Sequence, residues 1–250
     1  MIGVVGHSAH SSVQRPAHHP DQGLLLDYAT GAMAEPSALV IASHLAWCPD
    51  CREVIRCLER VGGEFLDQAE QQPVSMACFS RVMARLNEEL YLQPPPVLEL
   101  RSLHSDSGTN GIAELPQPLR SYLYAIAGDD LGTPLTALPW KRYLGGIDEV
   151  NLIVSKRHSA AVRVKLTRIR AGLAAPRHTH TGTELTVVLA GGFRDELGSY
   201  RRGDVLYHDG SVDHQPVADA EQDCLCLSVL DAPLRLTGPI GRLINPFLRF

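Results

Sequence analysis

The stretch GLAAPRHTHTGTELTVVLAG, from Gly172 to Gly191, decides the fold of the second half of the chain. His178 and His180 are two residues apart, so on a β-strand both side chains point to the same side. A short turn follows them, and Glu184 then projects to that side from the next strand. The stretch therefore predicts two adjoining strands that bring two imidazoles and a carboxylate together.

Short β-rich runs continue on both sides of this stretch. They are separated by Gly and Pro at nearly regular spacing, which favours an antiparallel sandwich or barrel. The clearest runs are 161–169, 185–190, 204–207 and 224–230. The second half of the chain is therefore predicted to be an antiparallel β-barrel.

The same residues resemble the first motif of the cupin family, G-x5-H-x-H-x3-E-x6-G, at every fixed position. A later stretch, 203–214, resembles the second cupin motif loosely. It keeps the histidine, but Asp209, Ser211 and Ala218 stand where Pro, Gly and Asn are usual. The resemblance implies a cupin barrel with one metal site, made by His178, His180, Glu184 and His214.

Three imidazoles and one carboxylate suit first-row metal ions. Cupin sites of this composition occur in iron or manganese dioxygenases and isomerases, and also in zinc proteins that are not catalysts. Zn²⁺ is the expected ion, with iron, manganese or nickel as alternatives. The competing interpretation is a chance histidine pair on an exposed loop.

The first third of the chain has a different texture, because its apolar residues recur at helical spacing. Four helices are expected: over 21–31, over 36–47, from Pro49 to Gly62 and Gly63 or a little beyond, and after Ser75 as N-cap. A Pro-, Ser- and Gly-rich stretch then interrupts the pattern. The prediction is an α + β chain of two domains: a tail (1–17), a small all-α zinc-bound module (18–93), a linker (94–118) and the barrel (119–250).

The segment HLAWCPDC, residues 44–51, contains a second set of metal-binding side chains. His44 and Cys48 are four residues apart and share one helix face, while Cys48 and Cys51 flank a tight Pro-Asp turn. Tetrahedral zinc needs a fourth ligand, which His19 supplies from the start of the first helix. The neighbouring His18 is the alternative fourth ligand, and a redox-active C-x-x-C pair is the alternative chemistry.

This histidine and cysteine pattern, followed by an amphipathic helix, closely resembles the zinc-binding anti-sigma domain. The layout with a cupin domain behind it is similar to anti-sigma factors of the ChrR type, from about residue 18 to the C-terminus. The resemblance implies a non-enzymatic inhibitor that sequesters an extracytoplasmic-function (group IV) sigma factor in a 1:1 complex. It also implies a cupin domain needed for release under oxidative stress such as singlet oxygen. The alternative is a cupin dioxygenase or isomerase with a helical appendage.

The fourth predicted helix carries an apolar stripe at spacings of three and four. Packing within the chain is the commoner fate of such a stripe, and contact with the sigma factor is the alternative expectation. The residues of the stripe are Phe79, Val82, Met83, Leu86 and Leu90.

Cys224 and Cys226 alternate along an apolar run, so both sulfurs are expected on one face of a strand. Two interpretations stay open. Both residues are small members of the core, or they form an oxidation-sensitive pair near the barrel's metal pocket, as the family resemblance suggests.

Charge and composition narrow the functional classes. The net charge is −5, and residues 18–93 hold five arginines against eleven acidic residues. This acidic bias disfavours direct DNA binding and suits a partner with a basic surface. The sequence shows no secretory signal and no apolar run of the ~18–20 residues that cross a bilayer. Six cysteines in such a chain indicate thiols and metal ligands in a reducing cytoplasm.

Overall fold

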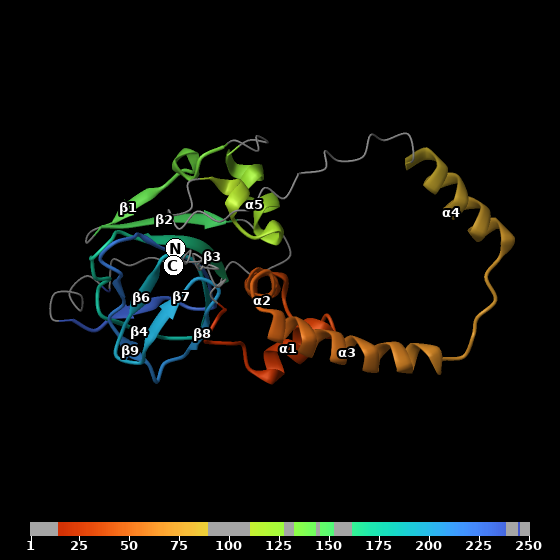
Figure 1. Ribbon diagram of the computed structural model, residues 1–250, viewed down its shortest axis with the longest axis horizontal. Coiled ribbons are helices and arrows are strands. Elements are labelled where there is room, and N and C mark those ends of the chain that lie inside the picture. The colour runs from red at the N-terminus through yellow and green to blue at the C-terminus, as the bar shows by residue number, and fades with distance from the viewer. Residues whose placement is uncertain are drawn as a thin grey trace, which may run out of the picture.

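The computed structural model describes residues 15–89, 111–127, 133–143, 146–152, 162–238 and 245. The expected α + β class is confirmed: a helical part comes first and a β-barrel follows (Figure 1). No helix among the described residues combines the length and the apolar character that a bilayer crossing requires. The α-helices of the described residues are α1 (Gln22–Ala29), α2 (Glu35–Leu45), α3 (Pro49–Asp67), α4 (Met76–Glu89) and α5 (Gln117–Ala127).

Local sequence explains where these helices begin. The Asp21 side chain caps α1 by accepting a hydrogen bond from the backbone N–H of Leu24 at 2.8 Å. Prolines stand in the first turns of α2 and α3, where no intrahelical N–H is needed. The Ser75 hydroxyl accepts from the backbone N–H of Cys78 at 3.2 Å at the start of α4, as its predicted cap role requires. α3 runs past Gly62 and Gly63 and ends at Asp67, a little beyond the two glycines as the sequence allowed.

Within the part of the barrel that the structure describes, the strand pairs are all antiparallel and form three sheets. The largest sheet has the order β1-β2-β3-β11-β5-β8, and the smaller ones have the orders β10-β6-β7 and β12-β4-β9. The strands are β1 (Lys141–Tyr143), β2 (Ile147–Leu152), β3 (Arg163–Ile169), β4 (His178–His180), β5 (Glu184–Ala190), β6 (Gly192–Arg194), β7 (Ser199–Arg201), β8 (Val205–His208), β9 (Asp213–His214), β10 (Val217–Ala218), β11 (Cys224–Leu230) and β12 (Leu234–Leu236).

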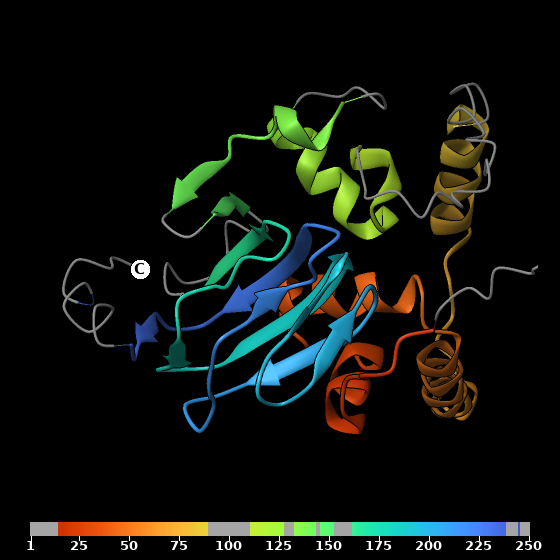
Figure 2. The ribbon, with the colours of Figure 1, turned by 60° about the vertical axis from the view of Figure 1, so that its left-hand side comes forward.

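The largest sheet is covered on both faces. One set of alternate side chains, such as Lys165 and Ser228, lines a cavity of about 390 Å³ inside the barrel. The other set, such as Leu166 and Leu227, belongs to a core shared with the helices. α2 packs against β5 and β11, and Figure 2 shows α1 and α2 (red to orange) beside the barrel. All seven residues of β11 are buried, because neither face of this central strand meets water.

The helical part and the barrel are therefore joined more closely than a linker implies. Residues 94–110 of the predicted linker, and 1–14 of the predicted tail, lie outside the described residues. Residues 111–118 were predicted to be linker, but they form a 3-10 turn, Ile112–Glu114, and the start of α5. Ile112 and Leu115 are fully buried in the shared core, since apolar contacts there outweigh the turn-prone composition around them.

Candidate metal centres

The four residues predicted for the helical site lie together. One ligand atom from each lies within 4.8 Å of the others, and all but one of the residues are buried. Three chain segments supply them: the approach to α1, the last turn of α2 and the first turn of α3. The residues of this group, called the thiolate cluster below, are His19, His44, Cys48 and Cys51.

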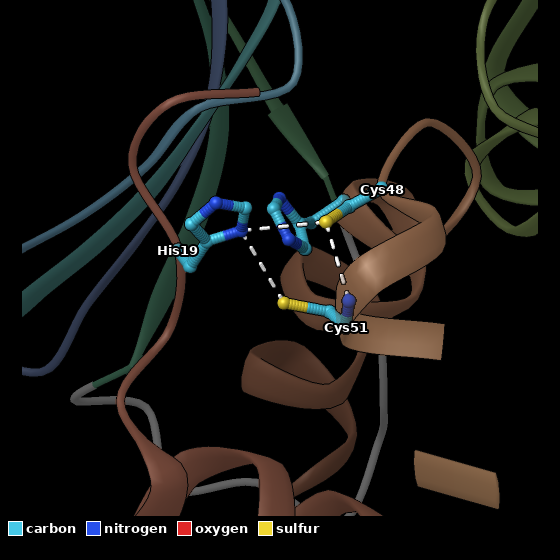
Figure 3. Close-up of side chains that lie close together, drawn as sticks. His19, Cys48 and Cys51 are labelled. Atoms are coloured by element: carbon cyan, nitrogen blue, oxygen red, sulfur yellow. Dashed lines mark hydrogen bonds between the residues drawn. The ribbon is translucent and has the colours of Figure 1, made fainter. Parts of the chain in front are cut away.

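The two sulfurs face one imidazole nitrogen. His19 Nδ1 lies 3.3 Å from Cys48 Sγ and 3.4 Å from Cys51 Sγ (Figure 3). Cys48 is the N-cap of α3, and its sulfur accepts a hydrogen bond from the Cys51 backbone N–H at 3.3 Å. Both cysteines are free thiols. A helix N-terminus stabilises negative sulfur, so this geometry suits two thiolates that share one cation.

The polar atoms of the cluster fit a metal ion. His44 Nδ1 must donate to the Gly203 carbonyl, 2.6 Å away, which leaves its Nε2 as a lone-pair donor. That Nε2 is buried and has no hydrogen-bond partner among the described residues. Burial and the adjacent Cys48 together raise the pKa of the Cys51 thiol to about 12, so two thiolates here require a cation.

The structure separates the two adjacent histidines that the sequence left as alternatives. His18 Nδ1 lies 3.3 Å from Asp204 Oδ2, and the His18 ring packs on Tyr200 with 4.7 Å between ring centroids. The His18 side chain thus contacts the barrel, whereas the His19 side chain points to the sulfurs. His19 is the ligand candidate.

Three of the four residues predicted for the barrel site also lie together. The ligand atoms of His178, His180 and His214 are within 4.8 Å of one another. His178 Nδ1 donates to the Pro176 carbonyl at 2.8 Å, and His214 Nδ1 is 2.7 Å from an Asp195 carboxylate oxygen. The remaining nitrogens, Nε2 of His178 and Nε2 of His214, are then both acceptors, yet they lie only 3.1 Å apart. Two facing lone pairs repel unless a cation or a proton lies between them, so this geometry fits a metal ion.

His180 and Glu184, which are also in the predicted barrel set, differ in how well they fit a metal site. Both ring nitrogens of His180 are buried and find no hydrogen-bond partner in the described part of the chain, which again fits a metal ligand. Glu184 Oε2 lies 3.3 Å from His180 Nδ1, but Glu184 is outside the group formed by the three histidines. Burial raises the pKa of Glu184, but Lys165, His180 and His178 outweigh burial and lower that pKa to about 2. The carboxylate is therefore ionised beside the histidines.

Two residues near this site were not predicted from the sequence. His208 on β8 packs its ring 4.6 Å from that of His214 and 5.6 Å from that of His180. His208 and Asp195 form a second group with His214, again with ligand atoms within 4.8 Å. For His208 the sequence offered a signal, because the residue lies in the stretch 203–214 that resembles the second cupin motif, and in the structure it pairs with Glu184 across β5–β8. Asp195 lies in the loop between β6 and β7, just beyond the last glycine of the first motif, and the spacing of that motif does not mark it.

The two cysteines of β11 lie as the alternation predicts. Their sulfurs are 3.6 Å apart, and both residues are buried and free. Both cysteines belong to one apolar cluster of buried residues, and Cys226 also lines the barrel cavity together with His178 and His214. The hydrogen bond between the Cys224 and Cys226 thiols, together with burial, raises the pKa of Cys224 well above its usual value.

The apolar stripe of α4 is exposed. Figure 1 shows α4 standing apart from the other elements. Leu90 lies outside the described residues. The exposed fractions of the others are 56% for Phe79, 53% for Val82, 42% for Met83 and 50% for Leu86.

Two family models match this chain, one on each part. The model described as the ChrR Cupin-like domain matches residues 129–232. A zinc-finger model matches residues 22–52, which include His44 and both cysteines of the thiolate cluster but begin after His19.

Known proteins are similar along nearly the whole chain. The anti-sigma-E factor ChrR of Cereibacter sphaeroides is 33% identical over 232 residues, covering 93% of this chain and 98% of that protein. The crystal structure of Rhodobacter sphaeroides SigE in complex with the anti-sigma ChrR matches with a TM-score of 0.67 and 31% identity. That match covers 86% of this chain and all of the matched chain.

Proposed function

This chain belongs to the ChrR family of anti-sigma factors, and from that premise we propose that it binds an extracytoplasmic-function sigma factor in a 1:1 complex. The observation that carries the proposal is the exposed apolar face of α4, at Phe79, Val82, Met83 and Leu86. Exposed apolar patches of this kind mark protein interaction sites. Val61 and Phe65 of α3 are exposed as well.

Charge supports the same class of partner. The helical part, residues 18–93, is acidic, with eleven carboxylates against five arginines. Sigma factors bind DNA and therefore carry basic surfaces, so attraction would speed their encounter with this part. We assign the binding of the partner to residues 18–93 and the regulation of its release to the barrel, residues 119–250.

The thiolate cluster would hold Zn²⁺ through His19, His44, Cys48 and Cys51. A zinc ion at this place ties three helix ends to one point, which short helices need because they bury little surface of their own. The exposed face of α4 follows α3 in the chain, so the geometry of α1–α3 sets where α4 begins. Loss of the cluster is therefore expected to weaken partner binding.

The barrel would be the element that responds to a signal. Its cavity holds a second candidate metal site at His178, His180 and His214, with Glu184 beside it. An oxidant that modified Cys226 would alter a side chain that lines this same cavity. Release of the sigma factor under oxidative stress such as singlet oxygen is the response that this arrangement favours. A tenfold loss of affinity needs only about 1.4 kcal/mol.

The alternative, a metal-dependent dioxygenase or isomerase, draws on the barrel cavity and its histidines. Family membership decides against it: the chain is a regulator rather than an enzyme.

Co-purification with a sigma factor tests the proposal. The chain is co-expressed with extracytoplasmic-function sigma factors from its own genome, and the captured complex is assayed for zinc. Cys48→Ser with Cys51→Ser should remove zinc from the thiolate cluster and release the sigma factor. Cys57→Ser is the matched control, because Cys57 is an exposed cysteine of the same helix and should change neither result.

Failure of the unaltered chain to capture any of these sigma factors would refute the proposed partner. Unchanged capture by the doubly substituted chain would refute the role of the cluster alone.

A further inference from the structure

The turn between β7 and β8, residues 201–205, contacts the thiolate cluster from the barrel. It belongs to the barrel by sequence and hydrogen bonding: Gly203 N–H donates to the Val188 carbonyl of β5 at 2.8 Å, and Val188 N–H donates to the Asp204 carbonyl at 3.0 Å. The turn is thus fixed to the central sheet. Its other contacts reach two different ligand segments of the helical part.

Asp204 holds the segment that leads into His19. Its Oδ1 accepts hydrogen bonds from the backbone N–H groups of Ala17 at 2.6 Å and His18 at 3.0 Å. Its Oδ2 lies 3.3 Å from His18 Nδ1 and accepts from the Arg201 N–H at 2.8 Å. The side chain of Asp204 is only 3% exposed. A buried carboxylate with four polar contacts fixes the backbone next to His19.

The adjoining residue, Gly203, holds the second ligand directly. Its carbonyl accepts the hydrogen bond from His44 Nδ1 at 2.6 Å, which selects the tautomer with Nε2 free for a metal. Gly203 has a φ of +93°, and a Cβ there would lie 2.7 Å from Cγ of Pro16. Only glycine allows the turn to approach the helical part this closely.

Further contacts surround the turn where the barrel meets the helical part, a boundary called the seam below. The Val205 N–H donates to the His18 carbonyl at 3.0 Å. The Arg202 guanidinium lies over the Trp47 ring at 4.8 Å, and Trp47 directly precedes Cys48. The turn therefore contacts His44 directly, and it contacts the residues that directly precede His19 and Cys48.

We propose that this turn sets the affinity of the thiolate cluster for its metal ion, with Asp204 as the positioning residue. The inference rests on the proposed metal at the cluster and not on the identity of the protein partner. Partners of ligand residues orient the ligands, and their loss costs about 10- to 100-fold in metal affinity. In this protein the partners belong to the barrel, so the helical site is complete only when the barrel is docked on it.

The same strand continues to the other metal site. β8 begins one residue after Asp204 and ends at His208, whose ring packs on those of His180 and His214. A displacement of β8 caused at the histidine site would reach the turn within four residues. Linkage requires the effect to be mutual, so metal at the thiolate cluster also stabilises barrel docking.

Cobalt titration of the full chain tests the inference. Co²⁺ bound by thiolates absorbs through sulfur-to-metal charge transfer, whereas Co²⁺ bound by imidazole and carboxylate does not, so the two sites are read separately in one sample. Asp204→Ala should weaken the thiolate site for Co²⁺ about 10- to 100-fold and leave the histidine site unchanged. Asp204→Asn keeps one acceptor oxygen and should weaken it less. Asp223→Asn is the matched control, because Asp223 caps the Ala171 N–H away from the seam.

The outcomes are distinguishable. Equal thiolate-site affinity in the unaltered chain and in Asp204→Ala, with the histidine site intact, overturns the inference. If Asp204→Ala loses the histidine site as well, the barrel has unfolded in that variant. The test then rests on Asp204→Asn alone, and an unchanged thiolate-site affinity in Asp204→Asn overturns the inference. An unaltered chain without charge-transfer absorption would remove the proposed metal and this inference together. Absorption with unaffected variants would remove this inference only.

Discussion

Three of the proposed ligand histidines have one ring nitrogen fixed by the protein. The Nδ1 atoms of His44 and His178 donate to the carbonyls of Gly203 and Pro176, and Nδ1 of His214 donates to the Asp195 carboxylate. Each bond leaves Nε2 as a lone pair and holds the ring in place before any metal arrives. The ligand side chains are thus already ordered in the folded protein, so little conformational entropy is lost when the metal binds, which favours tight binding.

A buried carboxylate outside the metal sites supports a prediction on stability. Asp148 on β2 is almost fully buried, with Arg168 Nη2 at 2.7 Å and Arg142 Nε at 3.2 Å. Burial raises the pKa of Asp148, but the hydrogen bonds from Arg168 and Arg142 outweigh burial and hold that pKa below its usual range. Asp148→Asn should lower the free energy of unfolding by about 2–3 kcal/mol at neutral pH, the value of charge-assisted hydrogen bonds.

The sign of the pH dependence follows from the lowered pKa. The stabilisation from ionised Asp148 is complete above the unfolded-state pKa of about 4, and it is lost as the pH falls through the lower folded-state pKa. Urea denaturation of the wild type and variant between neutral and acid pH measures this difference. A difference that grew toward acid pH would contradict the assignment. Glu53→Gln breaks an exposed ion pair with Arg56 and should change stability by less than about 1 kcal/mol.

At the scale of elements, α4 differs from the other helices in what covers its apolar face. α2 buries Leu39, Val40 and Ile41, whereas the stripe of α4 is exposed. The apolar residues of α2 are consecutive, as in a helix buried on several sides, whereas those of α4 recur at spacings of three and four on one face. Such a single stripe can pack within the chain or against a partner, and its spacing alone does not say which.

The exposed stripe supports a prediction on binding. Phe79→Ala should weaken binding of the sigma factor by about 2 kcal/mol or more, roughly 30-fold, because aromatic anchors dominate protein interfaces. The same change should leave the free energy of unfolding within about 0.5 kcal/mol, since an exposed side chain loses few contacts. Titration calorimetry and urea denaturation measure the two quantities. Leu197→Ala removes an exposed apolar side chain of the barrel and should alter neither. A large loss of stability in Phe79→Ala would show that the stripe packs within the chain.

At the scale of the whole molecule, the helical part and the barrel share one apolar core. Leu39 and Ile41 of α2 belong to the same cluster of buried residues as Val187 of β5 and Leu227 of β11. The outer face of the largest sheet would meet water if the helices left it. The two parts therefore stabilise each other across the seam.

The shared core predicts that the metal-loaded chain unfolds in one transition. Its two tryptophans are well placed to test this, because Trp47 lies at the end of α2 and Trp140 lies on the barrel side under Arg168. Urea denaturation of Trp47→Phe and Trp140→Phe, followed by fluorescence, reports the barrel and the helical part separately. Circular dichroism measures how much each substitution itself changes the stability. After correction for that change, the two fluorescence transitions should coincide. A Trp47 signal that changes well before the barrel signal would mean that the parts unfold independently.

Local sequence was sufficient for much of this protein. The Ser75 cap predicted the start of α4, and the H-x3-C-x2-C and H-x-H spacings predicted which side chains meet, because the geometry of helix turns and of strand alternation depends on neighbours in sequence. The cupin spacing likewise predicted the barrel and its family.

Contacts between distant residues were decided only by the tertiary structure. The barrel turn at Gly203 and Asp204 lies against His44 and His18, some 160 to 190 residues away in sequence, and nothing in the spacing of either segment signals it. The burial of Ile112 within a turn-prone stretch and the exposure of the α4 stripe were likewise decided by contacts between distant parts of the chain. Whether an apolar face is covered depends on what the rest of the chain places against it, and that is a property of the packed molecule.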